Sequence, residues 1–198
     1  MCIRDRLLLD RGANIEAANE DRWTPLHYAS MSGHLETVQL LLDQGADIAA
    51  ADEDGQTSLY RASMSGHPEI VQLLLDRGAN IAAASKDGQT PLHRASENGD
   101  FEVVQLLIAR GANIATATKN GQTSLHRASM NGRLKIVQLL LDRGANIAAA
   151  DGDGWASLHI ASVKGYLEIV QLLLDRGANI EAADKYRMTP LHLSLIHI

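Results

Sequence analysis

The chain has 198 residues, of which 45% are hydrophobic and only 4% aromatic, and its formal net charge is −6. The net negative charge excludes an overall positive surface potential of the kind with which nucleic-acid-binding proteins hold the phosphate backbone. The apolar runs are too short for a membrane-spanning helix. Cys2 is the only cysteine, so disulfides and cysteine-ligated zinc are excluded and an intracellular protein is expected. An apolar core that contains few aromatic side chains is suited to helices that pack closely together.

One sequence pattern returns every 33 residues without insertion or deletion. A Gly-Ala pair marks one phase of this pattern and a Thr-Pro-Leu-His box marks another. The glycines of the pair are Gly12, Gly45, Gly78, Gly111, Gly144 and Gly177. The box begins at Thr24, Thr57, Thr90, Thr123, Ala156 and Thr189. A period of this length is typical of a solenoid.

Within one unit, Asp52 to Ala84, the residues predict a turn followed by two short helices. The unit opens on the turn sequence Asp-Glu-Asp-Gly. Thr57 is a suitable N-cap for a helix over 58–65, and a second helix with an apolar face is expected over 68–77, followed by Gly78. Helices this short are not stable alone in water. Each must pack against the next unit, so an open stack is expected.

Between Leu7 and His192 the chain resembles the ankyrin repeat, through its period, its Thr-Pro-Leu-His-x-Ala box and its Val-Gln-Leu-Leu-Leu-Asp-Arg-Gly-Ala run. The resemblance implies an all-α solenoid of paired antiparallel helices with β-turn fingers, and a concave surface made by the fingers and the first helices. One departure is a serine in place of the family's usual second alanine. Its hydroxyl can bond back to a carbonyl one turn earlier, and because the side chain stays small we expect the change to be tolerated without a new function. These serines are Ser30, Ser63, Ser96, Ser129 and Ser162.

The period divides the chain into five full repeats flanked by two partial ones. We expect the full repeats at 19–51, 52–84, 85–117, 118–150 and 151–183, and the partial repeats at 7–18 and 184–192. Residues 1–6 and 193–198 break the pattern, and we interpret both as cloning or assembly artefact. A nucleotide word that encodes the first hexapeptide has a reverse complement that encodes the last, and it resembles a transposon end used in preparing sequencing libraries. The natural protein is then expected to continue in both directions.

Five of the eight histidines share one phase of the repeat, which argues against a metal or catalytic site. They are His27, His93, His126, His159 and His192. Copies on neighbouring packed helices lie about 10 Å apart and cannot converge on one ion; the family resemblance implies that each ties its helix to the adjacent loop. Catalysis needs one asymmetric constellation, which translational repetition works against. No catalytic residue, metal or cofactor is expected, and the protein is not expected to be an enzyme.

The positions that differ among units point to a binding surface, because packing explains only what recurs. They fall at the finger ends and at two first-helix positions, i and i+3, which share a face. Trp, Met and Arg are enriched in interface cores. The candidate partner-binding residues are Trp23, Tyr28, Met31, Arg61, Met64, Arg94, Glu97, Arg127, Met130, Trp155 and Ile160.

We expect the three arginines of this set to form an exposed ladder facing acidic groups of an elongated partner, beside an apolar methionine strip. The alternative is that Arg94 pairs with Glu97 on its own helix and the remainder is ordinary solvated surface.

The sequence therefore predicts a monomeric scaffold, without catalytic activity, that binds another protein on its concave surface. The alternative is a substrate-targeting or regulatory segment of a larger enzyme whose catalytic domain lies outside this chain. A third possibility, nucleic-acid binding through Arg61, Arg94 and Arg127, is opposed by acidic finger residues such as Glu53 and Asp54. Neither nucleic acid nor membrane is expected as a partner.

Overall fold

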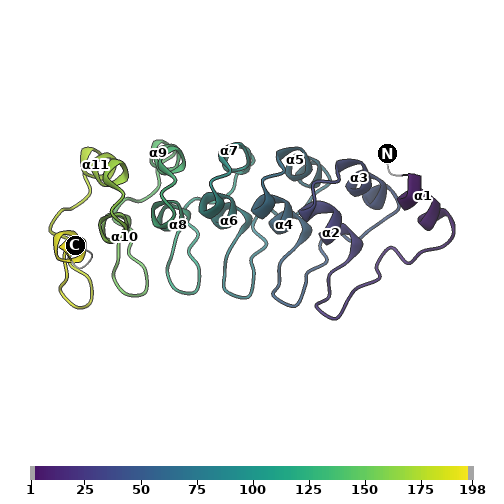
Figure 1. The fold of residues 1–198 in the computed structure, drawn as a ribbon, viewed down its shortest axis with the longest axis horizontal. Coiled ribbons are helices and arrows are strands. Elements are labelled where there is room, and N and C mark those ends of the chain that lie inside the picture. The colour runs from purple at the N-terminus through teal and green to yellow at the C-terminus, as the bar shows by residue number, and fades with distance from the viewer. Residues whose placement is uncertain (1–2, 196–198) are drawn as a thin grey trace.

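A computed structural model describes residues 3–195 and shows helices joined by long, hairpin-like connections (Figure 1). The helices in this range are α1 (Ile3–Asp10), α2 (Pro25–Met31), α3 (Leu35–Asp43), α4 (Ser58–Ser65), α5 (Pro68–Asp76), α6 (Pro91–Asn98), α7 (Phe101–Ala109), α8 (Ser124–Met130), α9 (Leu134–Asp142), α10 (Ser157–Lys164), α11 (Leu167–Asp175) and α12 (Pro190–Ser194). Within it no strand forms, and one isolated bridge joins Ala51 to Thr57. Parts of both segments interpreted as artefact, including Cys2 and residues 196–198, lie outside the described residues.

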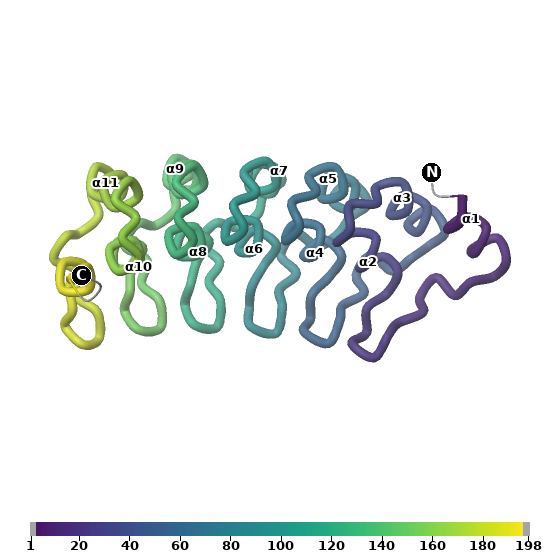
Figure 2. The backbone as a smooth tube through the Cα atoms, in the orientation of Figure 1, coloured from purple at the N-terminus to yellow at the C-terminus, as the bar shows by residue number. Residues whose placement is uncertain are grey.

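The helices form two rows, which confirms the all-α solenoid. The first helices of the units (α2, α4, α6, α8, α10 and α12) make one row, and the second helices (α3, α5, α7, α9 and α11) make the other (Figure 1). Each first helix from α2 to α10 packs on the first helix of the next unit and on the second helix of its own. The fingers project from the row of first helices and lie closer together than the second helices do (Figure 2). The surface formed by the fingers and first helices is called the concave face below.

Local sequence sets the helix boundaries as expected, within one residue. Thr57 is the N-cap of α4, and its side chain accepts a hydrogen bond from the backbone N–H of Tyr60 at 3.4 Å. Helix α5 ends at Asp76, one residue earlier than predicted, with Arg77 as its C-cap. Gly78 follows at φ +87°, a left-handed conformation that glycine adopts without steric cost. Its N–H donates to the carbonyl of Leu75 at 3.0 Å and closes the helix.

A single apolar core runs between the two rows of helices. Each second helix contributes a valine and a leucine to it, and in α5 these are Val71 and Leu74, both fully buried. Each such side chain contributes roughly 1.5–3 kcal/mol by leaving water. Because units face one another across this core, no unit has a core of its own, and stability depends on neighbouring pairs.

Most of the serines that replace the family's alanine leave their hydroxyl unpaired within the described residues. The side-chain oxygens of Ser30, Ser63, Ser96 and Ser129 are buried and have no hydrogen-bond partner among residues 3–195. The bond back to the preceding turn, which a serine hydroxyl can make, does not form at these four positions. The small side chain fits the tight contact between first helices, but its hydroxyl is buried without a hydrogen bond.

Candidate protein-interaction surface

Each finger is held by the side chain of its first residue. In the second finger one carboxylate oxygen of Asp52 accepts from the backbone N–H groups of Asp54, at 2.9 Å, and Gln56, at 2.8 Å. Asp151 and Asp184 hold their fingers in the same way. This local bonding is the reason that turn residues with side-chain oxygens stand at this phase. The tips are fixed in shape although they are exposed.

A backbone hydrogen bond also joins each finger to the next. The N–H of Lys86 donates to the carbonyl of Asp54 at 2.7 Å, and the N–H of Lys119 donates to that of Asp87 at 2.9 Å. The first finger is joined to the second through Glu53, and the remaining pairs are joined alike. The tips therefore form a continuous comb along one edge of the concave face, with fixed spacing between side chains of successive units.

The repeated histidine couples adjacent units, as the resemblance implied. In the third repeat the backbone N–H of Thr90 donates to Nδ1 of His93 at 3.1 Å, so Nδ1 carries no proton. The hydroxyl of Thr90 lies 2.8 Å from the same nitrogen. Nε2–H then donates to the carbonyl of Gln122 in the next finger, at 3.1 Å. Burial lowers the pKa of His93 to about 4, so the ring is neutral at pH 7.

The first-helix phase that holds the arginines is more recessed than the sequence suggested. Only Tyr28 is well exposed there, at 46%, whereas Ile160 is buried at 2%. The expectation of an accessible Ile160 was wrong. This phase faces the corner between the helix and its own finger, where a long side chain reaches outward and a β-branched one does not. Ile160 is thereby removed from the accessible set.

The arginines are paired within the chain, so the expected free ladder was wrong. Nη2 of Arg61 lies 2.5 Å from a carboxylate oxygen of Asp52, and that arginine's side chain is only 12% exposed. Arg94 lies 2.8 Å from Glu97, as the alternative interpretation had it, and Arg127 approaches the same carboxylate at 3.9 Å. Two carboxylates face the three guanidinium groups, because Glu97 is shared, so most of this positive charge is balanced within the chain. That weakens the case for an acidic partner or a nucleic acid at these positions.

The methionine strip lies beside these pairs on the first helices. Met31, Met64 and Met130 are all half-buried. The sulfur of Met64 accepts from a guanidinium nitrogen of Arg94 at 3.2 Å, so methionine and arginine from neighbouring units touch. The thioethers are flexible and polarizable, which suits contact with an apolar partner surface.

The two tryptophans lie in different surroundings. Trp23 is half-buried in an aromatic cluster with Tyr28, whose ring centre is 5.0 Å away, and the guanidinium of Arg61 lies 3.9 Å from the centre of the indole. Trp155 is also half-buried, and its indole N–H donates to Asp184 of the next finger at 3.0 Å. The first tryptophan presents an aromatic surface, whereas the second serves as a link between fingers.

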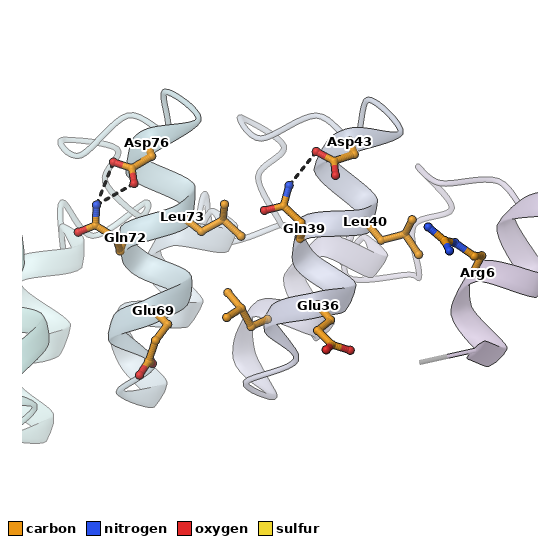
Figure 3. A pocket seen from close by; sticks show the side chains of 10 residues that line it. Arg6, Glu36, Gln39, Leu40, Asp43, Glu69, Gln72, Leu73 and Asp76 are labelled. Atoms are coloured by element: carbon orange, nitrogen blue, oxygen red, sulfur yellow. Dashed lines mark hydrogen bonds between the residues drawn. The ribbon is translucent and has the colours of Figure 1, made fainter. Parts of the chain in front are cut away.

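Sequence reasoning missed a groove on the opposite side of the molecule, lined by residues of α1, α3 and α5. Its volume is about 580 Å³; in Figure 3 Leu73 points from α5 toward α3 and Leu40 points from α3 toward Arg6 of α1, with carboxylates nearby. Two of these carboxylates, Asp43 and Asp76, accept hydrogen bonds from glutamines one turn earlier and pair with arginines of the next unit at 3.0 and 2.9 Å. These leucines lie half-buried beside the core, so their spacing alone did not mark a groove.

Among residues 3–195, no group of three histidine, cysteine or acidic side chains is placed to hold a metal ion. In the same range no helix has both the length and the apolar character needed to cross a bilayer.

The geometry defines a helical-repeat solenoid whose variable side chains gather on one face. Ankyrin-repeat models match residues 5–85 and 81–151 in blocks of three copies, and a single-repeat model matches residues 153–185. The chain therefore belongs to the ankyrin repeat family. No curated protein matches it. Ankyrin repeats are generally modules of protein–protein interaction and are typically non-catalytic.

Proposed function

We propose that this chain is a non-catalytic scaffold that binds another protein on its concave face. The observation that carries the proposal is the cluster of Trp23, Tyr28 and Arg61, an accessible aromatic surface on a face where units otherwise repeat. Aromatic and arginine side chains supply most hot spots of protein interfaces. Exposing the large ring of Tyr28 to solvent is unfavourable, and no packing requirement of the repeat explains a large ring at this position.

The rest of the proposed surface follows the row of first helices toward the C-terminus. It comprises the half-buried methionines, the pair of Arg94 and Glu97, Arg127, and Trp155 at the far end. Because the comb of fingers fixes their spacing, these side chains are arranged for an elongated partner segment that contacts several units. Preorganisation of this kind reduces the entropy lost on binding.

Site-specific photo-crosslinking tests the proposal. A benzophenone side chain is placed at Tyr28 or Met64 on the concave face, and in a matched control at Gln105, which is exposed on the second helix α7. Irradiation in an extract of the source cells should give the same covalent protein adduct from the two concave positions and none from the control. The purified partner should then lose at least tenfold in affinity when Tyr28→Ala is introduced. Adducts from Gln105 alone would place the partner on the second helices.

A further inference from the structure

The first and second fingers form a pocket on the concave face. Its volume is about 310 Å³. Its lining residues are Asp21, Trp23, Asp52, Glu53, Asp54 and Arg61. One wall is an indole ring and most of the remainder is carboxylate, which is the combination that attracts an organic cation.

The inner wall of this pocket already holds a guanidinium, which belongs to the chain itself. Arg61 lies 3.9 Å from the centre of the Trp23 ring, and its Nη2 lies 2.5 Å from Asp52. Asp52 is buried and pairs with this one cation, so its charge is satisfied. The pair demonstrates that the indole and a carboxylate at this spacing can hold a planar cation between two fingers.

The outer wall is different, because its carboxylates have no cation. The side chains of Asp21, Glu53 and Asp54 are exposed and make no hydrogen bond or ion pair within residues 3–195. Elsewhere on the face, Glu97 is paired with two arginines and Asp184 with an indole N–H. Three unneutralised carboxylates thus gather beside one aromatic ring here, whereas the finger that carries Trp155 has a single exposed and unpaired carboxylate, Asp153.

The finger tips also change charge along the comb. The first two tips carry Glu20, Asp21, Glu53 and Asp54 against the single cation Arg22, a net charge of −3. The third and fourth tips carry two lysines and one aspartate, a net charge of +1. Exposed charges within about 8–10 Å act together at physiological salt. An incoming cationic segment is thus directed to the N-terminal end of the comb.

We propose that this pocket receives a lysine or arginine side chain from a basic segment of a protein partner, with its charge among Asp21, Glu53 and Asp54 and its stem along Trp23. The inference rests on the proposed function and gives the partner a chemistry: basic at the N-terminal fingers and apolar along the methionine strip. It replaces the acidic partner that the arginine positions alone had suggested, because Asp52 and Glu97 balance most of the arginines' charge within the chain.

The two tryptophans allow a direct test with an acetylated, amidated tetra-arginine peptide as the probe. In a ¹⁵N-labelled protein at about 150 mM salt, the indole N–H resonance of Trp23 should shift saturably with added peptide, while that of Trp155 stays in place. A Trp155→Phe variant assigns the two signals. A tetra-glutamate peptide should leave both unmoved. Equal shifts at both tryptophans, or none at Trp23, would overturn the proposal.

Charge-matched double variants separate the pocket from general electrostatic attraction. Glu53→Gln with Asp54→Asn should weaken tetra-arginine binding at least fivefold. Asp87→Asn with Asp153→Asn removes the same charge from other exposed tips and should change the affinity by less than twofold. Equal weakening by both pairs means that only net charge matters, and the pocket is then not the site. Circular dichroism before each titration verifies that both double variants keep their helices intact.

A failure of the basic-segment inference can be distinguished from a failure of the proposed function. If the peptide does not bind but crosslinks still form from Tyr28 and Met64, the concave face binds a partner and only the basic chemistry is wrong. If the peptide moves Trp23 while natural-partner crosslinks come from Gln105, the pocket exists but the concave face is not the main protein-binding surface.

Discussion

Side-chain hydroxyls that lack partners are a weakness of the core at the scale of single residues. A buried hydroxyl without an acceptor costs about 1–3 kcal/mol relative to one that is hydrogen bonded. The four enclosed serines repeat this cost at the same phase of successive first helices. Because neighbouring first helices pack tightly, alanine fits the same space without the polar atom.

Replacing one of these serines with alanine should therefore stabilise the protein. Ser96→Ala is expected to raise the free energy of unfolding by about 1 kcal/mol, since it removes an unpaired hydroxyl and leaves no large cavity. Ser162→Ala is the control, because Ser162 occupies the same phase but is half-buried, and it should have a smaller effect. Urea denaturation measures both. A lower midpoint for Ser96→Ala would show that this hydroxyl has found a partner in solution.

A second residue-scale cost lies in the first finger, where Arg22 adopts φ +63°. Four later fingers have glycine at this phase, at φ between +75° and +85°. The left-handed conformation costs a residue with a Cβ about 1–2 kcal/mol, and added flexibility of the unfolded chain returns part of that on changing to glycine. Arg22 therefore marks a finger whose local sequence conflicts with its turn.

Arg22→Gly is expected to raise the free energy of unfolding by roughly 0.5–1 kcal/mol, the difference between these two effects. The reverse change, Gly88→Arg, should destabilise by more, because a Cβ there would lie 3.1 Å from the backbone nitrogen of Lys119 in the next finger. Thermal unfolding of the two variants beside the parent checks the order. Equal stability of all three would mean that the finger relaxes to another turn.

At the scale of the element, the first helix of the fifth repeat begins without a side-chain cap. Ala156 occupies the N-cap, and only its backbone N–H reaches Nδ1 of His159, at 3.1 Å. In the other repeats with this histidine, the threonine hydroxyl also lies within 2.9 Å of that nitrogen. Ser157 does not replace the missing hydroxyl, because its side-chain oxygen is buried and has no partner among residues 3–195.

Restoring the threonine should strengthen this helix start. Ala156→Thr is expected to raise the free energy of unfolding by about 1 kcal/mol, the usual effect of an N-cap. Thr90→Ala, the matched removal in the third repeat, should lower it by a similar amount. Both values come from denaturant midpoints at constant slope. If the first variant has no effect while the second destabilises, the fifth repeat is insensitive to its cap.

The elements themselves could be predicted closely from the sequence, and the reason is the period. Thr57, Gly66 and Gly78 mark starts and ends that local chemistry dictates, so α4 and α5 were placed to within one residue. The exposure of Ile160 could not be predicted in the same way, because it depends on how its finger and the next unit close around it. The pairing of Arg61 with Asp52 likewise joins two elements nine residues apart, and residue type alone does not reveal it.

At the scale of the whole molecule, the repeated histidines make hydrogen bonds between neighbouring units, and these bonds depend on pH. Burial lowers the pKa of His27, His93 and His126, in all three against the opposing effect of hydrogen bonds to backbone carbonyls. Protonation of Nδ1 would turn an acceptor into a donor facing the backbone N–H of the N-cap residue. The neutral ring is therefore required by the same geometry that couples one repeat to the next finger.

The sign of the resulting pH dependence follows from these pKa values. A histidine whose pKa is 6.5 when unfolded and about 4 when folded contributes stability above pH 6.5, and this stability is lost as the pH falls toward 4. For His93 the loss between pH 7 and pH 5 is about 2 kcal/mol. The carboxylates with lowered pKa values, such as Asp184, lose their contribution only below 3.8 and do not interfere in this window.

Acidification from pH 7 to pH 5 is therefore expected to lower the urea midpoint of the whole array in one cooperative transition, because the units share a core. His93→Tyr is the matched variant, since Tyr60 occupies the same phase and is buried there in the native chain, with its hydroxyl 3.4 Å from Gln89. It should reduce the loss between the two pH values by about 2 kcal/mol, whatever other groups titrate, because the comparison is between two proteins that differ at one site. A parent and variant with the same pH dependence would mean that the pKa of His93 is not lowered in the folded protein, or that protonation opens only one local link without weakening the stack. Hydrogen exchange at the backbone N–H of Thr90 separates these two cases, because a local opening exposes that group while the distant repeats remain protected.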